Sequence, residues 1–241
     1  MSMKILIVGL LAASVACSPE RNINGGEGRD AVAKDGDAPS SRTTAAAPAK
    51  VTVLFFGTSL TAGYGLDPSV AFPNLIARTA AGEGMPIVVV NAGLSGETSA
   101  GALRRIDWTL RKPVDIVVLE TGGNDALRAL DPDTLQANIR AIVSRIRSAQ
   151  PGARILLAVM EAPPNLGARY TSSFRNAYAT VAKNENLTLV PFLLDKVAGR
   201  AELNQADGVH PNEKGERIVA DNVWRTLRPV VQEVYRNRPK G

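Results

Sequence analysis

From Val51 to the end of the chain, short apolar runs alternate with longer stretches in which apolar positions recur every three or four residues. Runs that are rich in β-branched residues and apolar at nearly every position are typical of strands buried on both faces of a parallel sheet. Five such runs predict strands, at Val51–Phe56, Ile87–Asn91, Asp115–Glu120, Arg154–Met160 and Leu187–Val190. The intervening periodicity predicts helices, at Pro68–Ala81, Thr98–Arg111, Asp131–Ala149, Tyr170–Asn184 and Glu213–Tyr235.

This alternation predicts an α/β fold, a single flavodoxin-like domain in which helices cover both faces of a five-stranded parallel sheet. Right-handed crossovers place the carboxyl ends of all the strands at one edge of the sheet, where ligands of such folds bind. A functional site is therefore expected in the segments that follow the strands, which are Gly57–Leu60, Ala92–Thr98, Thr121–Asp125, Glu161–Gly167 and the loop after Val190.

The first sixteen residues form a leader, with Lys4 followed by the apolar run Ile5–Ala16. This run is too short to span a bilayer and indicates a secretory signal peptide. Ser14–Cys17 resembles a bacterial lipobox, although serine occupies the position where leucine is usual. Cys17 is the only cysteine, so no intramolecular disulfide can form, and we expect lipid attachment there to hold an exported protein on the periplasmic side of a membrane. The alternative is an ordinary cleaved signal and a soluble periplasmic protein.

Residues 17–49 are rich in Gly, Ala, Ser, Pro, Asp and Arg and predict a disordered tether, because they offer too little apolar surface to offset the entropy of ordering. Residues 50–241 are long enough for one domain with a sizeable core, and we expect a monomer. The net charge of +5 is spread along the chain. No pattern of aromatic and basic residues indicates nucleic-acid binding, while weak attraction to anionic membranes stays open.

Ser59 and His210 are the candidates for nucleophilic chemistry. Ser59 directly follows the first strand and faces the first amides of the next helix, which stabilise negative charge. His210 is the only histidine and lies just before the last helix, three residues after Asp207. That spacing lets Asp207 accept a hydrogen bond from one ring nitrogen while the other nitrogen exchanges a proton with the nucleophile. Without a second histidine or a thiol in the domain, neither a metal nor a cofactor is expected.

An ester hydrolase also needs hydrogen-bond donors for the oxyanion, and two small-residue loops offer them. The glycines of Asn91–Thr98 let backbone amides face a cavity, and Asn124 in Thr121–Asp125 supplies a side-chain amide. Each loop taken alone is as well explained by a tight turn.

Together, in order and spacing, these four stretches resemble the four sequence blocks of the SGNH hydrolases, the GDSL esterase superfamily. The resemblance implies that Ser59 is the nucleophile, with Asp207 and His210 completing the triad. It also implies an oxyanion hole formed by the amides of Ser59 and Gly96 and the side chain of Asn124. The blocks look most like the bacterial arylesterase, lysophospholipase and acyl-CoA thioesterase I group. The implied function is hydrolysis of small-molecule carboxylic esters or thioesters through an acyl-enzyme.

One position departs from that group, and one loop has a composition of its own. Thr58 stands where the family usually has aspartate, and we expect its hydroxyl to cap the following helix, with an effect on rate through the way Asn124 is held. Glu161–Gly167 falls where the group carries a mobile substrate loop, and its prolines suggest a stiffer loop or a rigid connector.

Other motif assignments for the same residues have less support in the sequence. Gly57–Ser59 is not the nucleophile elbow of α/β-hydrolases, because Thr61 replaces its second glycine, and Gly63–Gly65 lacks the third glycine of a dinucleotide fingerprint. Two alternatives stay open: a carbohydrate O-deacetylase, as some SGNH proteins are, and a non-catalytic surface binding protein on the same scaffold. The chain carries no appended sugar-binding module, and its triad is complete.

Overall fold

The computed structural model describes residues 50–238, so the predicted leader, Cys17 and the tether at 17–49 lie outside the described residues. Five parallel strands form one sheet in the order β2-β1-β3-β4-β5, which confirms the predicted α/β fold. The strands are β1 (Val51–Gly57), β2 (Ile87–Gly93), β3 (Ile116–Glu120), β4 (Arg154–Ala158) and β5 (Thr188–Val190).

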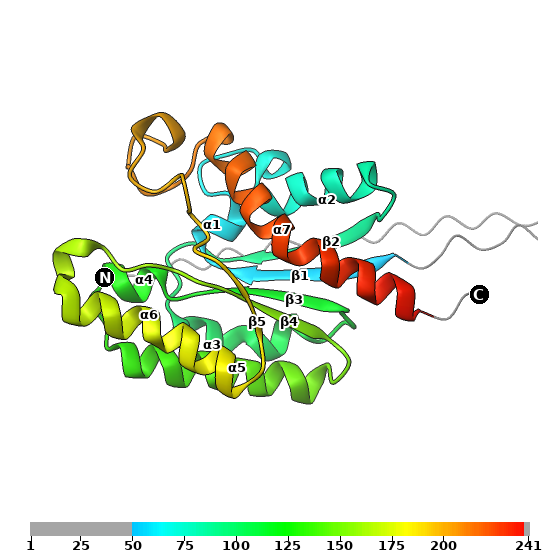
Figure 1. Cartoon of the computed structure of the whole chain (residues 1–241), viewed down its shortest axis with the longest axis horizontal. Helices are drawn as coiled ribbons and strands as arrows, with labels where there is room; N and C mark the ends of the chain where they lie inside the picture. The colour runs from blue at the N-terminus through cyan, green and yellow to red at the C-terminus, as the bar shows by residue number, and fades with distance from the viewer. Residues whose placement is uncertain (1–49, 239–241) are drawn as a thin grey trace, which may run out of the picture. The chain divides into compact units, whose positions relative to one another are not determined.

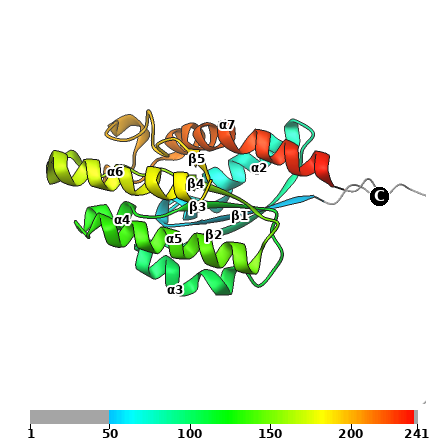
Figure 2. The ribbon, with the colours of Figure 1, turned by 60° about the horizontal axis from the view of Figure 1, so that its bottom comes forward.

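Helices cover both faces of this sheet, with α2 and α7 on one face and α3, α5 and α6 on the other (Figures 1 and 2). The α-helices are α1 (Ser59–Ala62), α2 (Phe72–Gly82), α3 (Ser99–Thr109), α4 (Gly123–Leu127), α5 (Pro132–Ala149), α6 (Gly167–Asn184) and α7 (Glu213–Asn237). Short 3₁₀ helices lie at η1 (Pro68–Val70), η2 (Pro164–Leu166) and η3 (Ala201–Leu203). None of the helices within residues 50–238 combines the length and the apolar character needed to cross a bilayer.

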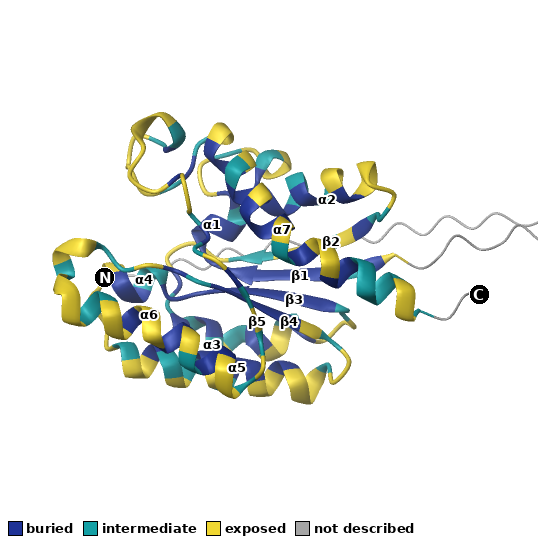
Figure 3. Cartoon of the chain, in the orientation of Figure 1, coloured by how far each residue is buried: buried dark blue, intermediate teal, exposed yellow. Residues whose placement is uncertain are grey.

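The core lies along the two central strands β1 and β3, which are buried over almost their whole length (Figure 3). Alternate side chains of a strand point to opposite faces, so one strand anchors both helical layers. Phe55 of β1 packs edge-on against Phe72 of α2, with ring centroids 5.8 Å apart. Its neighbour Phe56 lies under the guanidinium of Arg105 on α3, 4.1 Å from the ring centroid.

The prediction of one helix over Pro68–Ala81 was wrong, because the chain breaks at Ala71 into η1 and α2. An unbroken helix would need an N–H at Pro73 and would push its ring against the carbonyl of Ser69. The break instead places Pro73 in the first turn of α2, where no N–H is required. Asp131 caps α5 as expected, accepting the amides of residues 133 and 134 at 3.3 and 3.2 Å.

The register of the sheet brings three loops together at one edge. Gly57 of β1 pairs with Gly93 of β2, and Phe56 pairs with Leu119 of β3. The segments that leave these strands therefore start side by side, although they are separated by tens of residues in sequence. These are the turn that leads into Ser59 of α1, the loop that holds Gly96 and the turn that leads into Asn124 of α4.

Candidate active site

Ser59 is the first residue of α1, directly after β1, and is buried except for its face toward a cavity. The short turn before it is possible only because residue 57 is glycine. A Cβ at Gly57 would lie 2.1 Å from Thr61 Oγ1 and 2.6 Å from Glu120 Oε2. The nucleophile candidate is therefore fixed by a strand on one side and a tightly packed turn on the other.

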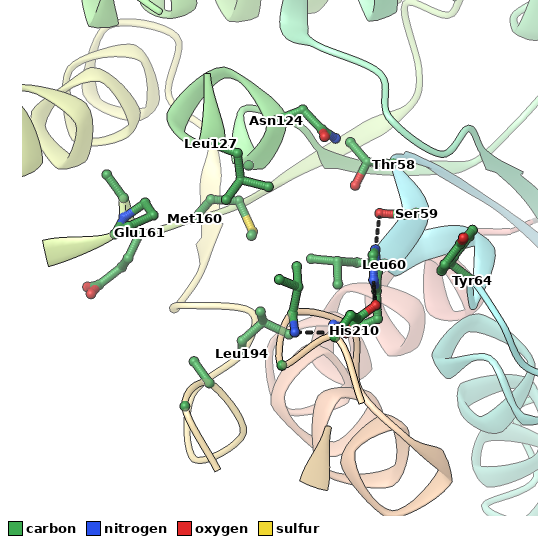
Figure 4. Close-up of a pocket in the computed structure, with 18 of the residues that line it drawn as sticks. Thr58, Ser59, Leu60, Tyr64, Asn124, Leu127, Met160, Glu161, Leu194 and His210 are labelled. Carbon is green, nitrogen blue, oxygen red and sulfur yellow. Dashed lines mark hydrogen bonds and ion pairs between the residues drawn. The ribbon is translucent and has the colours of Figure 1, made fainter. Parts of the chain in front are cut away.

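The structure brings Ser59, His210 and Asp207 into a hydrogen-bonded chain, although the serine and the histidine are 151 positions apart. Figure 4 shows Ser59 and His210 at one side of the cavity. His210 Nε2 lies 2.9 Å from Ser59 Oγ, and His210 Nδ1 lies 2.6 Å from Asp207 Oδ2. The other carboxylate oxygen of Asp207 accepts the amides of Val209 and His210 at 2.9 and 3.0 Å. Both ring nitrogens thus have the partners that the sequence predicted.

Hydrogen bonds also set the charge of Asp207. The amide and the ring of His210, followed by the amide of Val209, hold the pKa of the Asp207 carboxyl at about 2. The carboxylate is ionised at neutral pH, so it can only accept a hydrogen bond, and Nδ1 of the ring must carry the hydrogen that it donates. Nε2 of the neutral ring is then free of hydrogen and can accept the hydroxyl proton of Ser59.

Tyr64 lies against the other side of the histidine, with ring centroids 4.7 Å apart and the planes tilted by 41°. The carbonyl of Tyr64 accepts the side-chain amide of Gln205 at 2.7 Å, and the amide of Gln205 donates to the carbonyl of His210 at 2.8 Å. This contact was not predicted. It ties the histidine loop to the segment that follows α1.

Gly96 and Asn124, the other residues that the resemblance assigns to the oxyanion hole, line the same cavity as Ser59. Polar contacts that were not predicted join their segments to neighbouring elements. Asp125, beside Asn124, accepts the amide of Ser99 at 2.8 Å and its hydroxyl at 2.6 Å, which joins α4 to the start of α3. Arg128 donates to the carbonyl of Gly96 at 3.0 Å.

A second set of polar contacts, made by Arg105, joins the Gly96 loop to the end of β1. Glu97 and Arg105 form a largely buried ion pair with a shortest distance of 2.6 Å. Arg105 also donates to the carbonyl of Gly57 at 3.1 Å. The loop is therefore fixed to the strand that carries the nucleophile and not only to its own helix.

Glu120, at the end of β3, is the functional-site residue that the sequence analysis missed. Its carboxyl is buried and accepts the amide of Thr58 at 2.7 Å, the hydroxyl of Thr58 at 2.9 Å and the hydroxyl of Thr61 at 3.0 Å. Burial raises the pKa of Glu120, and these hydrogen bonds oppose that effect in part. One signal was available: a charged residue closing an otherwise apolar buried strand needs partners.

The expected cap by Thr58 was wrong. Its hydroxyl makes no hydrogen bond to the amides of α1 and donates instead to Glu120. The hydroxyl is turned toward the buried carboxyl on the neighbouring strand, so a long-range contact stands where the sequence suggested a local one. Thr58 therefore joins the nucleophile turn to β3, which leads directly into the loop of Asn124.

The cavity beside Ser59 has a volume of about 810 Å³, within the range of small-molecule sites. Much of its wall is apolar and comes from α4, the Glu161–Gly167 loop and the segment after β5. The apolar lining residues are Leu60, Leu127, Met160, Ala162, Pro163, Pro164, Phe192, Leu194, Ala198 and Val209. Within residues 50–238, no group of three or more His, Cys, Asp or Glu side chains could hold a metal ion.

Comparison with known proteins identifies the family of the chain. Residues 55–218 match the model of the GDSL-like Lipase/Acylhydrolase family. The chain belongs to this family. It is 42% identical over 182 residues to Esterase TesA of Pseudomonas aeruginosa, covering 75% of this chain and 89% of the relative.

Two further relatives support the same assignment. Thioesterase 1/protease 1/lysophospholipase L1 of Escherichia coli K12 is 34% identical over 191 residues, covering 77% of this chain and 87% of the relative. The crystal structure of esterase EstA from Pseudoalteromonas sp., inhibited by monoethylphosphonate, is 33% identical with a TM-score of 0.71, covering 75% of this chain and 98% of that chain. The chain is a carboxylic ester hydrolase with the SGNH fold.

Proposed function

We propose that the protein hydrolyses carboxylic esters or thioesters of apolar acyl groups through an acyl-enzyme on Ser59. The observation that carries this proposal is the chain of hydrogen bonds from Ser59 through His210 to Asp207, at 2.9 and 2.6 Å, at the mouth of an apolar cavity. A serine hydroxyl is a weak nucleophile until a base that is itself oriented by a third group removes its proton.

In the first half-reaction, Ser59 Oγ attacks the carbonyl carbon while its proton passes to His210 Nε2. Asp207 stabilises the imidazolium that forms, without taking the proton itself. Collapse of the tetrahedral intermediate breaks the bond to the leaving oxygen or sulfur, which receives the proton from Nε2. Water then attacks the acyl-enzyme by the same route in reverse, giving the acid and free Ser59.

The negative oxygen of each intermediate is held by the amides of Ser59 and Gly96 and by the side-chain amide of Asn124. Such donors are effective when they are fixed before the reaction, because no energy is then spent in reorienting them. The contacts of Asp125, Arg105 and Glu120 described above fix the three donor segments relative to one another.

The apolar wall formed by residues such as Met160, Phe192 and Leu194 suits the acyl group. Burial of apolar surface favours longer chains by about 0.8 kcal/mol per methylene until the cavity is filled. Aryl esters, lysophospholipids and acyl-CoA are all candidate substrates, in keeping with the activities in the relatives' names.

The decisive test compares Ser59→Ala with Ser95→Ala, a second serine that lines the cavity. Ser59→Ala should lower turnover of a short-chain p-nitrophenyl ester by about 10⁴-fold or more, with unchanged circular dichroism and melting temperature. Ser95→Ala should retain most of the activity. A fluorophosphonate should modify the wild-type peptide that contains Ser59. Undiminished turnover by Ser59→Ala, or no labelling, would refute the mechanism.

The same assays distinguish the two alternative functions that the sequence left open. Release of acetate from acetylated oligosaccharides without turnover of aryl esters would identify a carbohydrate O-deacetylase. A folded protein that neither reacts with the phosphonate nor turns over any ester would act as a binding protein.

We also propose that the protein is exported and anchored by lipid on Cys17, facing the periplasm. Support comes from the leader and the lipobox-like Ser14–Cys17. Metabolic labelling with a fatty acid should mark the wild-type chain in the membrane fraction, but not Cys17→Ser. An unlabelled, soluble periplasmic wild-type protein would show that the cysteine is incidental.

A further inference from the structure

We propose that Gln205 is a positioning residue that keeps His210 in place while the acyl-enzyme is hydrolysed. This inference rests on the proposed acyl-enzyme on Ser59 and concerns its second step. Gln205 does not line the cavity. It acts through residues 204–211, the histidine loop, which carries His210.

The histidine loop is closed on itself. Its two ends meet in an antiparallel bridge between Asn204 and Pro211. The amide of Gln205 donates to the carbonyl of His210 at 2.8 Å. A Cβ at Gly208 would meet no atom within 4 Å, so nothing in residues 50–238 covers that point of the loop. These contacts give the loop its shape, but they do not fix it against the nucleophile turn.

The side chain of Gln205 supplies that connection. Its Nε2 donates to the carbonyl of Tyr64 at 2.7 Å and to the carbonyl of Pro211 at 3.0 Å. The amide of Tyr64 in turn donates to the carbonyl of Ser59 at 3.0 Å. One side-chain amide therefore joins the residue after His210 to a residue that is hydrogen-bonded to the backbone of the nucleophile.

Gly65 makes room for this side chain. A Cβ at position 65 would lie 2.4 Å from Oε1 of Gln205, and φ of Gly65 is +77°. Any other residue there would push the carboxamide away from the carbonyl of Tyr64 and would strain the backbone. The glycine and the glutamine therefore fit each other, although they lie in segments that are far apart in the chain.

The catalytic hydrogen bond cannot do the work of Gln205 throughout the reaction. Within residues 50–238, two hydrogen bonds join the histidine loop to residues 57–66: the one between Ser59 and His210, and the one from Gln205. In the acyl-enzyme the serine oxygen belongs to an ester, and neither this oxygen nor Nε2 of the neutral ring carries a hydrogen. The bond from Gln205 and the contact between the rings of Tyr64 and His210 then remain.

Deacylation should therefore depend on Gln205 more than acylation does. During acylation the hydroxyl of Ser59 itself holds the ring, at 2.9 Å from Nε2. During deacylation the ring must take a proton from a water molecule, and its position is set by the histidine loop and its remaining contacts. One neutral hydrogen bond corresponds to about a tenfold effect on a rate.

A single turnover of p-nitrophenyl butyrate, with protein in excess, separates the two steps. Release of p-nitrophenolate follows acylation, and acid quenching with intact mass measurement follows the decay of acyl-Ser59. Gln205→Met keeps the length of the side chain without its N–H groups. We expect the decay to slow about tenfold in this variant and acylation to slow less than about threefold. In the steady state, kcat and KM should fall together.

Two further variants complete the test. Gln205→Glu keeps the shape of the side chain but has no N–H at neutral pH, so it should show the same imbalance. Asn74→Ala is the matched control, because the Asn74 side-chain amide also donates to a backbone carbonyl at 2.7 Å, that of Pro68, outside the histidine loop. It should leave both rates within about twofold of the wild type. Equal slowing of the two steps in both Gln205 variants would overturn the inference.

This inference and the proposed function fail in different ways. If the wild type forms no acyl-Ser59 and is not labelled by a fluorophosphonate, the proposed function fails. If acyl-Ser59 forms in the wild type and decays at the same rate in Gln205→Met, only the role of Gln205 is excluded.

Discussion

Removing the carboxyl of Glu120 should damage both the stability and the chemistry of the enzyme, although this residue does not line the cavity. Glu120→Ala leaves three donors of the nucleophile turn without an acceptor: the amide and hydroxyl of Thr58 and the hydroxyl of Thr61. The amide of Thr58 is part of the backbone that positions Ser59. The turn should therefore shift as well as lose stability.

The size of the effect follows from those contacts. A buried donor left without a partner costs about 1–3 kcal/mol. The two hydroxyls can rotate to other acceptors but the backbone amide cannot, so we expect a loss of about 3 kcal/mol in the free energy of unfolding. For a domain of this size that loss lowers the melting temperature by roughly 10 °C. A displacement of Ser59 by about 1 Å would lower kcat about 100-fold.

Glu120→Gln is the matched control, because its amide keeps the shape of the carboxyl. It can accept the amide of Thr58 through its oxygen and donate to the hydroxyl of Thr58 through its nitrogen. We expect this variant to stay within about 1 kcal/mol of the wild type and to retain most of the kcat. Chemical denaturation and p-nitrophenyl ester kinetics measure both quantities. Wild-type kcat in Glu120→Ala, or equal losses in the two variants, would refute the reasoning.

Three further predictions concern other parts of the fold. Burial raises the pKa of the Glu216 carboxyl from the ordinary 4.5 to about 8. The stabilising contribution of this group is therefore complete below pH 4.5 and is lost as the pH rises to about 8. Urea unfolding between pH 4.5 and 8 should show the wild type losing up to about 1.4 kcal/mol of unfolding free energy per pH unit relative to Glu216→Gln. Gly122→Ala should lower the melting temperature and kcat together, because φ is +102° and the new Cβ would lie 2.2 Å from Tyr178 Oη; an unchanged melting curve would contradict this. Asp207→Asn should keep the melting temperature but lower kcat by about 10⁴-fold, since the ring would lose the partner that sets its tautomer, and wild-type kcat would exclude that role.

The sequence alone predicted the strands and the approach of side chains that are distant in the chain. β-branched runs predicted all five strands, and the parallel arrangement then required Ser59 and the other loops to share one edge. The approach of His210 to Ser59, now measured at 2.9 Å, was expected from the position of its loop and from the family resemblance.

What sequence reasoning missed depends on contacts between distant residues. Helices α1 and α4 have four and five residues, too few to show a period. The partner of Thr58 is Glu120, 62 positions away, and a local capping rule has no means of finding it. Glu120 itself was counted as the end of a strand, because periodicity records where apolar residues fall and not which polar group completes a network.

The residues proposed to cleave the ester and the residues that form most of the apolar wall follow different strands of the sheet. The residues proposed to act on the carbonyl follow β1, β2 and β3 or belong to the loop before α7, whereas much of the apolar wall follows β4 and β5. Mutations in those last two loops can alter which acids the enzyme releases without disturbing the groups that cleave the ester. Few substitutions should therefore be needed, in nature or in the laboratory, to change the acyl-chain length that the enzyme prefers. Phe192 and Leu194 are the first positions to randomise.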